Sequence, residues 1–124
     1  MDDMISSGES MIDTAKLLKQ RLAKRVIVCT TFGLFTNGPK AFDEAYEKGF
    51  IDCVITTNLN YIPAEILDRP WYKQADLSRA LASIINTFNH DAPLSEAMHP
   101  HYKIQKLARR YKSSEPYDYI GKIV

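Results

Sequence analysis

Two adjacent carboxylates and several hydroxyl side chains stand together at the start of the chain. Residues 2–10 read Asp-Asp-Met-Ile-Ser-Ser-Gly-Glu-Ser, and a helical pattern follows directly. Small residues let the backbone close around an anion, and the free N–H groups at a helix start point at it. Asp2 and Asp3 can accept hydrogen bonds from sugar hydroxyls or hold a divalent cation through oxygen. A phosphate at one end and a diol at the other together describe a ribose phosphate. The competing interpretation is a solvated turn that caps the helix.

Periodicity predicts the elements that must position this stretch. Residues 25–30 and 52–56 are apolar at their centres, as in parallel strands covered on both faces. Residues 71–75 have mixed polarity, which is typical of an edge strand. Helices are predicted at 10–22, 40–48, 63–67 and 77–89, and loops at 31–39 and 58–63.

The same patterns predict helix ends and helix faces. Ser10 and Asp13 have the spacing of a shortened capping box. Asp76 is predicted to cap the helix that starts at Leu77. An apolar stripe predicts the buried face of that helix, and it consists of Ala80, Leu81, Ile84, Ile85 and Phe88.

Alternating helices and strands indicate an α/β fold with parallel pairing and right-handed crossovers. Ligands bind such sheets beyond the carboxyl ends of the strands. We expect the acidic pair and the loops at 31–38 and 56–60 to meet there and to line one crevice.

Composition narrows the class of protein. The chain has 124 residues, 45% hydrophobic and 25% charged, with a formal net charge of +1. This charge gives no reason to expect a nucleic-acid partner. No apolar run reaches the roughly 18 residues of a membrane span, and the acidic start is no signal peptide. Cys29 and Cys53 lie in apolar runs and are predicted to be reduced.

These motifs resemble the ribose-phosphate pyrophosphokinases. Residues 2–10 are similar to the loop of two acidic residues, two apolar residues and Asp-Thr-Gly-Gly-Thr that these enzymes share with type I phosphoribosyltransferases. Residues 31–39 are similar to Thr-His-Gly-Ile/Leu-Phe-Ser-Gly-Pro, and residues 56–63 to Val-Thr-Asn-Thr-Ile-Pro. The likeness covers residues 2–89. Phe32 takes the place of the usual His, and Ser6 and Glu9 depart from the usual Asp and Gly.

The resemblance implies a three-layer phosphoribosyltransferase-like fold, doubly wound on a mainly parallel sheet. Residues 1–90 would be the C-terminal domain of such an enzyme, and residues 91–124 a helical or irregular tail. The family enzyme has two similar domains, so the chain resembles a fragment truncated at its N-terminal strand. Strand 25–30 would then have an unpaired edge.

By the same resemblance, the parent activity transfers a diphosphoryl group from ATP to ribose 5-phosphate. The expected context is the cytoplasm and a homo-oligomer, with Mg²⁺ and ATP bound by the complete enzyme. The isolated chain is expected to be inactive and to contain no catalytic residue. The implied ribose 5-phosphate site is Asp2, Asp3, Ser6, Ser7, Gly8, Glu9 and Ser10, with Asp2 and Asp3 also the candidate metal ligands.

Two rival interpretations remain. One is a catalytically silent regulatory or binding subunit with the same fold, and the other is a fragment of a true phosphoribosyltransferase. Residues 31–39 argue against the latter, because that loop resembles the kinase. His99 and His101 around a proline are read as a surface turn rather than a metal site. The basic stripe of the predicted helix 102–111 is read as a solvated face.

Overall fold

The computed structural model describes residues 1–91, 93, 101, 104–105 and 108–109. The chain divides into two compact units, Met1–Asp76 and Leu77–Val124. Most of the predicted helix 102–111 lies outside the described residues, as do His99 and residues 112–124. The predicted domain boundary after residue 90 stays a prediction.

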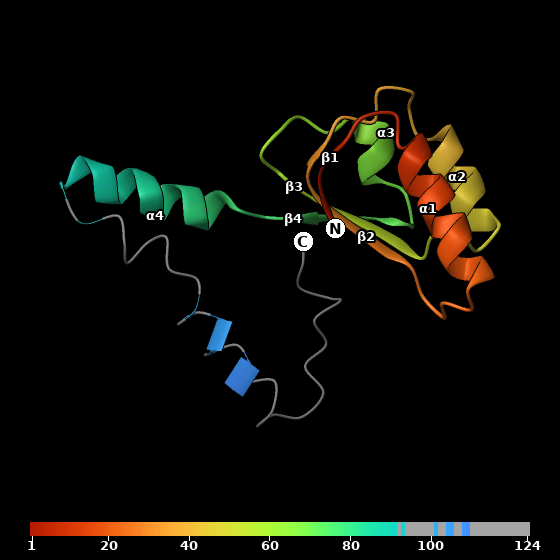
Figure 1. Ribbon diagram of the computed structural model, residues 1–124. Helices are drawn as coiled ribbons and strands as arrows, with labels where there is room; N and C mark the ends of the chain where they lie inside the picture. The colour runs from red at the N-terminus through yellow and green to blue at the C-terminus, as the bar shows by residue number, and fades with distance from the viewer. Residues whose placement is uncertain (92, 94–100, 102–103, 106–107, 110–124) are drawn as a thin grey trace. The chain divides into compact units, whose positions relative to one another are not determined.

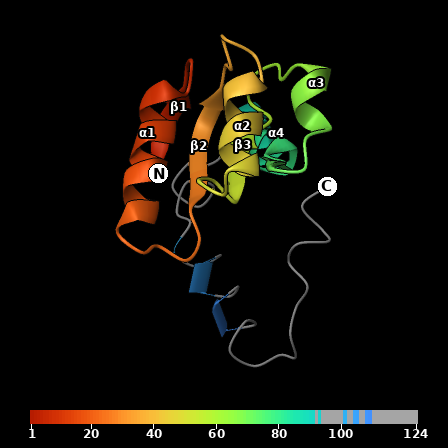
Figure 2. The same ribbon diagram turned by 90° about the vertical axis from the view of Figure 1, so that its right-hand side faces the viewer.

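The first unit is a parallel sheet with helical connections, which confirms the α/β prediction (Figures 1 and 2). The four strands lie in the order β1-β2-β3-β4, so each connection steps to the next strand in the same direction. The elements are β1 (Asp2–Ile5), α1 (Glu9–Gln20), β2 (Ile27–Gly33), α2 (Lys40–Glu47), β3 (Cys53–Thr57), α3 (Ala64–Leu67) and β4 (Tyr72–Ala75).

Apolar side chains of the sheet and of α1 and α2 form the core of this unit. Helices α1 and α2 lie side by side in both views (Figures 1 and 2). Ile12 and Ala15 of α1 and Phe42 of α2 are buried in one cluster with Val28 and Val54 of the sheet. Burying such a side chain contributes about 1.5–3 kcal/mol, so this layer holds the strand ends in place.

The acidic pair lies in a strand, which the sequence did not predict. Asp2 to Ile5 form β1, and β1 pairs with β2 through Asp2 and Thr30, Met4 and Phe32, and Ile5 and Gly33. Because Asp is unfavourable in strands, the local sequence gave no indication of β1. The strand forms because it pairs with β2, which is distant in sequence. The expected unpaired edge is therefore wrong from Thr30 onward. Among the described residues it holds only for the first half of β2.

Other predicted boundaries shift as well. β2 continues through Gly33, so the start of the predicted loop 31–39 belongs to the strand. Helix α1 begins at Glu9 with Gly8 as its N-cap and has no side-chain cap, so the capping box is wrong. Asp13 instead forms an ion pair with Lys16 at 2.8 Å. The predictions for α2, α3 and the edge strand β4 are right to within one or two residues.

The second unit contains helix α4 (Ser78–Asn89). Leu77, rather than the predicted Asp76, takes the N-cap position, and the Leu77 side chain makes no capping hydrogen bond. Asp76 accepts a hydrogen bond from Asn58 Nδ2 at 2.8 Å. Within its own unit α4 has no buried residue among those described, and the packing of the predicted stripe stays a prediction. None of the described helices has the length and apolar character that a membrane span requires.

Asp52 fastens the end of α1 to the amino-terminal ends of two strands. Its Oδ2 accepts hydrogen bonds from the Val26 N–H at 2.7 Å and from Lys19 Nζ at 2.9 Å. The Asp52 N–H donates to the Val26 carbonyl at 2.9 Å. The hydrogen bond from the Val26 N–H, and to a smaller extent the one from Lys19, hold the pKa of the Asp52 carboxyl below its usual value.

Because these contacts require the Asp52 carboxylate in its charged form, we predict that their contribution to the stability of the fold is lost in acid. A lowered native pKa means that the contribution is complete above the unfolded pKa of about 3.9 and is lost as pH falls through the native value. We expect Asp52→Asn to lower the free energy of unfolding at pH 7 by roughly 1–3 kcal/mol, because charge-assisted hydrogen bonds become neutral ones. The variant should also lose less stability than the parent between about pH 4 and pH 2, as measured by urea denaturation.

Asp13→Asn is the matched control, because the Asp13 side chain is 72% exposed in its ion pair with Lys16. Exposed pairs contribute about 0–1 kcal/mol. Equal losses of stability in the two variants would contradict the role given to Asp52.

Candidate functional site

The hydroxyl turn, residues 6–10, connects the carboxyl end of β1 to the first turn of α1. Gly8 at its centre has φ +86°, a left-handed conformation that favours glycine. A Cβ at Gly8 would collide with the ring of Phe42. Gly8 is therefore required both by its backbone conformation and by the close packing of the turn on α2.

The loop after β2 is bonded to this turn through the main chain. Leu34 N–H donates to the Ile5 carbonyl at 2.8 Å, and Thr36 N–H donates to the Ser6 carbonyl at 3.0 Å. These bonds place residues 34–38 beside the hydroxyl turn. The sequence analysis placed the acidic pair beside this loop, whereas the structure places the hydroxyl turn there.

A third segment joins them through Asn60, whose role the sequence analysis missed. Asn60 Nδ2 donates to the Gly33 carbonyl at 2.8 Å, and Asn60 Oδ1 accepts from the Gly33 N–H at 3.4 Å. Thr57 Oγ1 donates to the Thr31 carbonyl at 2.7 Å. An Asn that follows a parallel strand was the available signal, because its amide can imitate a main-chain partner.

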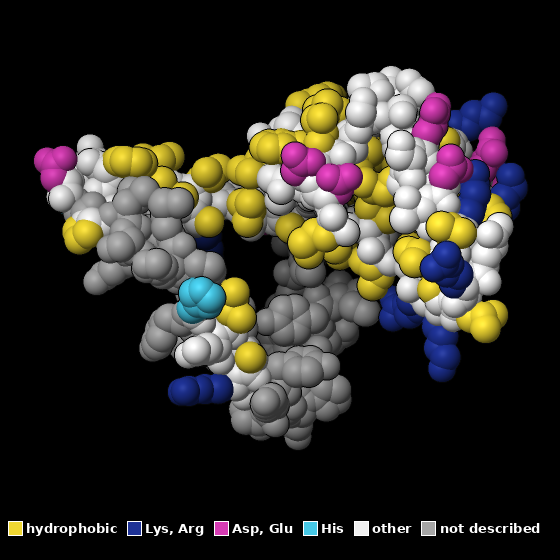
Figure 3. Space-filling model, viewed as in Figure 1, with side chains coloured by type: hydrophobic (Ala, Val, Ile, Leu, Met, Phe, Trp, Pro, Cys, Tyr) yellow, Lys and Arg dark blue, Asp and Glu magenta, His cyan; other side chains and the backbone are white. Residues whose placement is uncertain are grey.

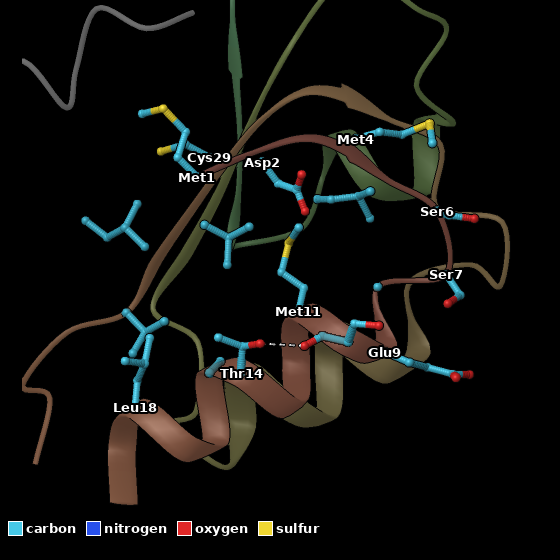
Figure 4. Close-up of a pocket in the computed structure, with 17 residues that line it drawn as sticks. Met1, Asp2, Met4, Ser6, Ser7, Glu9, Met11, Thr14, Leu18 and Cys29 are labelled. Atoms are coloured by element: carbon cyan, nitrogen blue, oxygen red, sulfur yellow. Dashed lines mark hydrogen bonds between the residues drawn. The ribbon is translucent and has the colours of Figure 1, made fainter. Parts of the chain in front are cut away.

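The predicted binding residues differ in exposure along the turn. Ser6, Glu9 and Ser10 are exposed, Ser7 is half-buried and Gly8 is buried. The side chains of Ser6, Ser7 and Glu9 lie at one end of the site, away from Thr14 and Leu18 of α1 (Figure 4). No hydrogen bond within the described residues occupies the hydroxyls of the three serines. The hydroxyls and the N–H groups that open α1 are thus free to meet an anion.

The acidic pair lies before the turn rather than at the edge of the sheet. Asp2 pairs with Thr30, three positions before the carboxyl-terminal pair of Ile5 and Gly33. The Asp2 side chain extends from β1 toward α1 (Figure 4). Asp3 N–H donates to Asp2 Oδ1 at 2.9 Å, and both side chains are exposed. The placement of both carboxylates beside the loops at the edge is therefore wrong, although they stay on the strand that carries the turn.

A hollow of about 390 Å³ lies between β1, the first half of β2 and α1 (Figure 4). The hydroxyl turn forms one end of it. Away from the turn the lining is mainly apolar, with Asp2 and Thr14 as its polar side chains, and the Thr14 hydroxyl donates to the Ser10 carbonyl at 2.8 Å. The apolar residues there include Met11, Ala15, Leu18, Val26, Ile27, Val28 and Cys29. The apolar side chains offer no donor to an anion, so the predicted phosphate site is confined to the turn end of the hollow.

The described residues contain no group of three or more His, Cys, Asp or Glu side chains that could hold a metal ion. Of the acidic pair, Asp2 lines the hollow and Asp3 does not. Carboxylate oxygens suit Mg²⁺, which proteins often bind through one or two carboxylates together with substrate phosphates. The residues present fit that mode of binding and not an all-protein metal site.

The chain is similar in sequence to a known protein family and to several named proteins. The family model described as phosphoribosyl synthetase-associated domain matches residues 1–99. The ribose-phosphate pyrophosphokinase of Mycoplasma pneumoniae is 32% identical over 97 residues, which are 77% of this chain and 29% of that protein. The ribose-phosphate pyrophosphokinase of Prochlorococcus marinus is 40% identical over 65 residues, 52% of this chain and 19% of that protein.

A differently named protein is similar to the same extent. The human phosphoribosyl pyrophosphate synthase-associated protein 2 is 32% identical over 98 residues, 77% of this chain and 25% of that protein. The chain therefore spans less than a third of the length of these relatives.

The packing of the turn gives a prediction with an internal control. We expect Gly8→Ala to lower the free energy of unfolding by about 2–5 kcal/mol, because a left-handed residue costs about 1–2 kcal/mol and overpacking adds about 1–3 kcal/mol. Gly38 also has a positive φ, +70°, but a Cβ added there would meet no atom within 4 Å. Gly38→Ala should cost only the backbone part, and denaturation that shows equal costs would contradict the Gly8–Phe42 contact.

Proposed function

Because the chain belongs to the phosphoribosyl synthetase-associated domain family, we propose that it is the ribose 5-phosphate-binding half of a ribose-phosphate diphosphokinase. The observation that carries the proposal is the hydroxyl turn, which stands between a strand end and a helix start and keeps its serines free. The relatives named ribose-phosphate pyrophosphokinase support it.

The proposed roles follow from the chemistry of each group. The hydroxyls of Ser6, Ser7 and Ser10 and the N–H groups at the start of α1 donate to the 5-phosphate, where the helix dipole also favours negative charge. Asp2 and Asp3, one strand length away, accept hydrogen bonds from the ribose hydroxyls. Glu9 points to solvent, and its backbone N–H remains a donor to the phosphate.

The proposed reaction passes a diphosphoryl group from ATP to the C1 hydroxyl of the bound sugar. Mg²⁺ in the complete enzyme would neutralise charge on the phosphates, with an oxygen of Asp2 or Asp3 as its protein ligand. This chain would position the sugar, while the groups that handle ATP belong to the part of the enzyme that lies outside these 124 residues. We also propose that the complete protein is a cytoplasmic homo-oligomer.

A second candidate is a binding or regulatory subunit without catalysis. The description of the matched family and the relatives named synthase-associated proteins favour it. Both candidates share the fold, so sugar phosphate binding at the turn separates them better than the fold does. A subunit that has lost the chemistry can also lose the affinity.

We predict that ribose 5-phosphate binds at the hydroxyl turn. Titration followed by amide chemical shifts should perturb residues 6–10 first. Ser7→Ala or Ser10→Ala should weaken binding about tenfold or more, because a hydrogen bond to a charged group contributes about 1.5–3 kcal/mol.

Glu9→Gln is the matched control in that titration. If the Glu9 carboxylate faces solvent, its neutralisation should change the affinity less than about threefold, or roughly 0.65 kcal/mol. Ribose without phosphate and inorganic phosphate without ribose should each bind more weakly. An unperturbed turn at millimolar ribose 5-phosphate, or a hundredfold gain in Glu9→Gln, would favour the non-catalytic candidate.

We further predict that the isolated chain does not form AMP from ATP and ribose 5-phosphate in the presence of magnesium. The reason is that no described residue is suited to binding the nucleotide. Steady turnover by the pure protein, abolished by Ser10→Ala, would show that the chain is catalytically complete and would refute this prediction.

A further inference from the structure

Asn60 takes the place of a neighbouring strand at the end of β2. β3 ends at Thr57, whereas β2 continues to Gly33. The Asn60 amide bonds to both main-chain groups of Gly33, since Nδ2 donates to the carbonyl at 2.8 Å and Oδ1 accepts from the N–H at 3.4 Å. Nδ2 also donates to the Tyr61 carbonyl at 3.0 Å. Because the amide has two N–H donors, both are already used within the protein.

Gly33 depends on these bonds because it has no side chain that could hold it. A Cβ at Gly33 would lie 2.6 Å from the Phe35 ring and 2.9 Å from Thr56 Cγ2, so the packing around it requires a glycine. Glycine also has more backbone freedom than any other residue. The bonds from Asn60 therefore fix the direction in which the chain leaves β2.

The segment that leaves β2 is bonded to the hydroxyl turn. The Thr36 N–H, three residues after Gly33, donates to the Ser6 carbonyl at 3.0 Å. Phe35, just before it, has φ +48°, a left-handed conformation that is uncommon for a residue with a side chain. Such a conformation persists only where the surrounding contacts impose it. The bond from Thr36 to Ser6 therefore depends on an anchor before Phe35, and Asn60 provides one.

The hydroxyl turn must bind an anion by well-directed donors. Within residues 6–10 and 34–38 the only charged side chain is the carboxylate of Glu9. On the face shown in Figure 3, acidic side chains lie over β1, and Lys and Arg side chains gather mainly around α1 and α2. A hydrogen bond weakens steeply once its angle falls below about 120°, whereas the attraction between charges depends on distance alone. Small rotations of the turn should therefore reduce its affinity for a phosphate.

We propose that Asn60 is a positioning residue for ribose 5-phosphate, and that it acts through Gly33 and Thr36 without touching the ligand. The proposal rests on the proposed function of the hydroxyl turn. By fixing the end of β2, Asn60 keeps the Thr36 N–H on the Ser6 carbonyl. This bond sets the peptide plane between Ser6 and Ser7, and with it the direction of the donors that follow toward the phosphate.

The aromatic cluster around Phe35 is the alternative anchor of this segment. The Phe35 ring lies 5.3 Å from the ring of Phe42 and 6.0 Å from that of Tyr72, measured between centroids. These contacts bury the ring, but hydrophobic burial is non-directional. They hold the side chain without setting the direction of the main-chain N–H groups, which the hydrogen bonds of Asn60 do set.

Asn60→Leu and Thr57→Val form the matched pair of variants, because each keeps the approximate shape of the side chain and removes hydrogen bonds from the same loop. Thr57 Oγ1 donates to the Thr31 carbonyl at 2.7 Å and accepts from the Leu59 N–H at 3.2 Å. Thr31 lies inside β2 rather than at its end. In titrations of the full chain with ribose 5-phosphate, Asn60→Leu should weaken binding about fivefold or more, or roughly 1 kcal/mol. Thr57→Val should weaken it less than about twofold.

Amide hydrogen exchange separates positioning from a general loss of stability. The Val54 N–H donates to the Trp71 carbonyl at 2.7 Å in the core and reports global unfolding. The Thr36 N–H reports local opening beside the turn. In ligand-free Asn60→Leu, exchange at Thr36 should accelerate more than exchange at Val54. In Thr57→Val the two amides should accelerate by the same factor.

The outcomes distinguish this role from the proposed function. A parent chain that does not bind ribose 5-phosphate would refute the proposed function and the role of Asn60 with it. A parent chain that binds, with equal affinity in Asn60→Leu or an equal loss in both variants, would refute the role of Asn60 alone. Unchanged exchange at Thr36 relative to Val54 would also refute it. Asn60→Ser, whose shorter side chain cannot reach both groups of Gly33, gives the same comparison should Asn60→Leu not fold.

Discussion

The contact between the hydroxyl turn and the ring of Phe42 connects the candidate site to the core of the first unit. Phe42 stacks on Trp71 at 5.3 Å between ring centroids and meets the edge of Phe35 at 5.3 Å. These rings come from α2, the segment before β4 and the loop after β2. Gly8 packs where a Cβ would collide with Phe42, so the turn can keep its shape only while this aromatic cluster is intact.

The two ends of the sheet are held by different forces. At the amino-terminal ends, the charge of Asp52 joins α1 to β2 and β3 through Lys19 and Val26. At the carboxyl-terminal ends, main-chain bonds and the amide of Asn60 join the loops. The bonds that join the hydroxyl turn, the loop after β2 and Asn60 thus involve no charged side chain. This arrangement leaves the electrostatics of the turn to the serines, the helix start and the exposed carboxylates.

The relatives and the geometry bear on function in different ways. Similarity to ribose-phosphate pyrophosphokinases and to synthase-associated proteins defines the family but not the activity, because both kinds of name occur at 32% identity. Two proteins of this fold can differ in whether they bind a sugar phosphate. The turn, with free hydroxyls at a helix start, is the feature on which that difference would depend. The chain covers less than a third of these relatives, so the proposed activity belongs to a larger protein.

The sequence by itself determined the alternation of helices and strands, the turn of small residues and its place before α1. These features depend on local periodicity and on residue size, which neighbours along the chain express. Only the tertiary structure decided that Asp2 and Asp3 belong to a strand, because two carboxylates disfavour one locally and pairing with Thr30 to Gly33 overrides them. It alone decided the contact of Gly8 with Phe42 and the amide bonds of Asn60 to Gly33. Each joins residues far apart along the chain, and no local pattern records which distant group will be near.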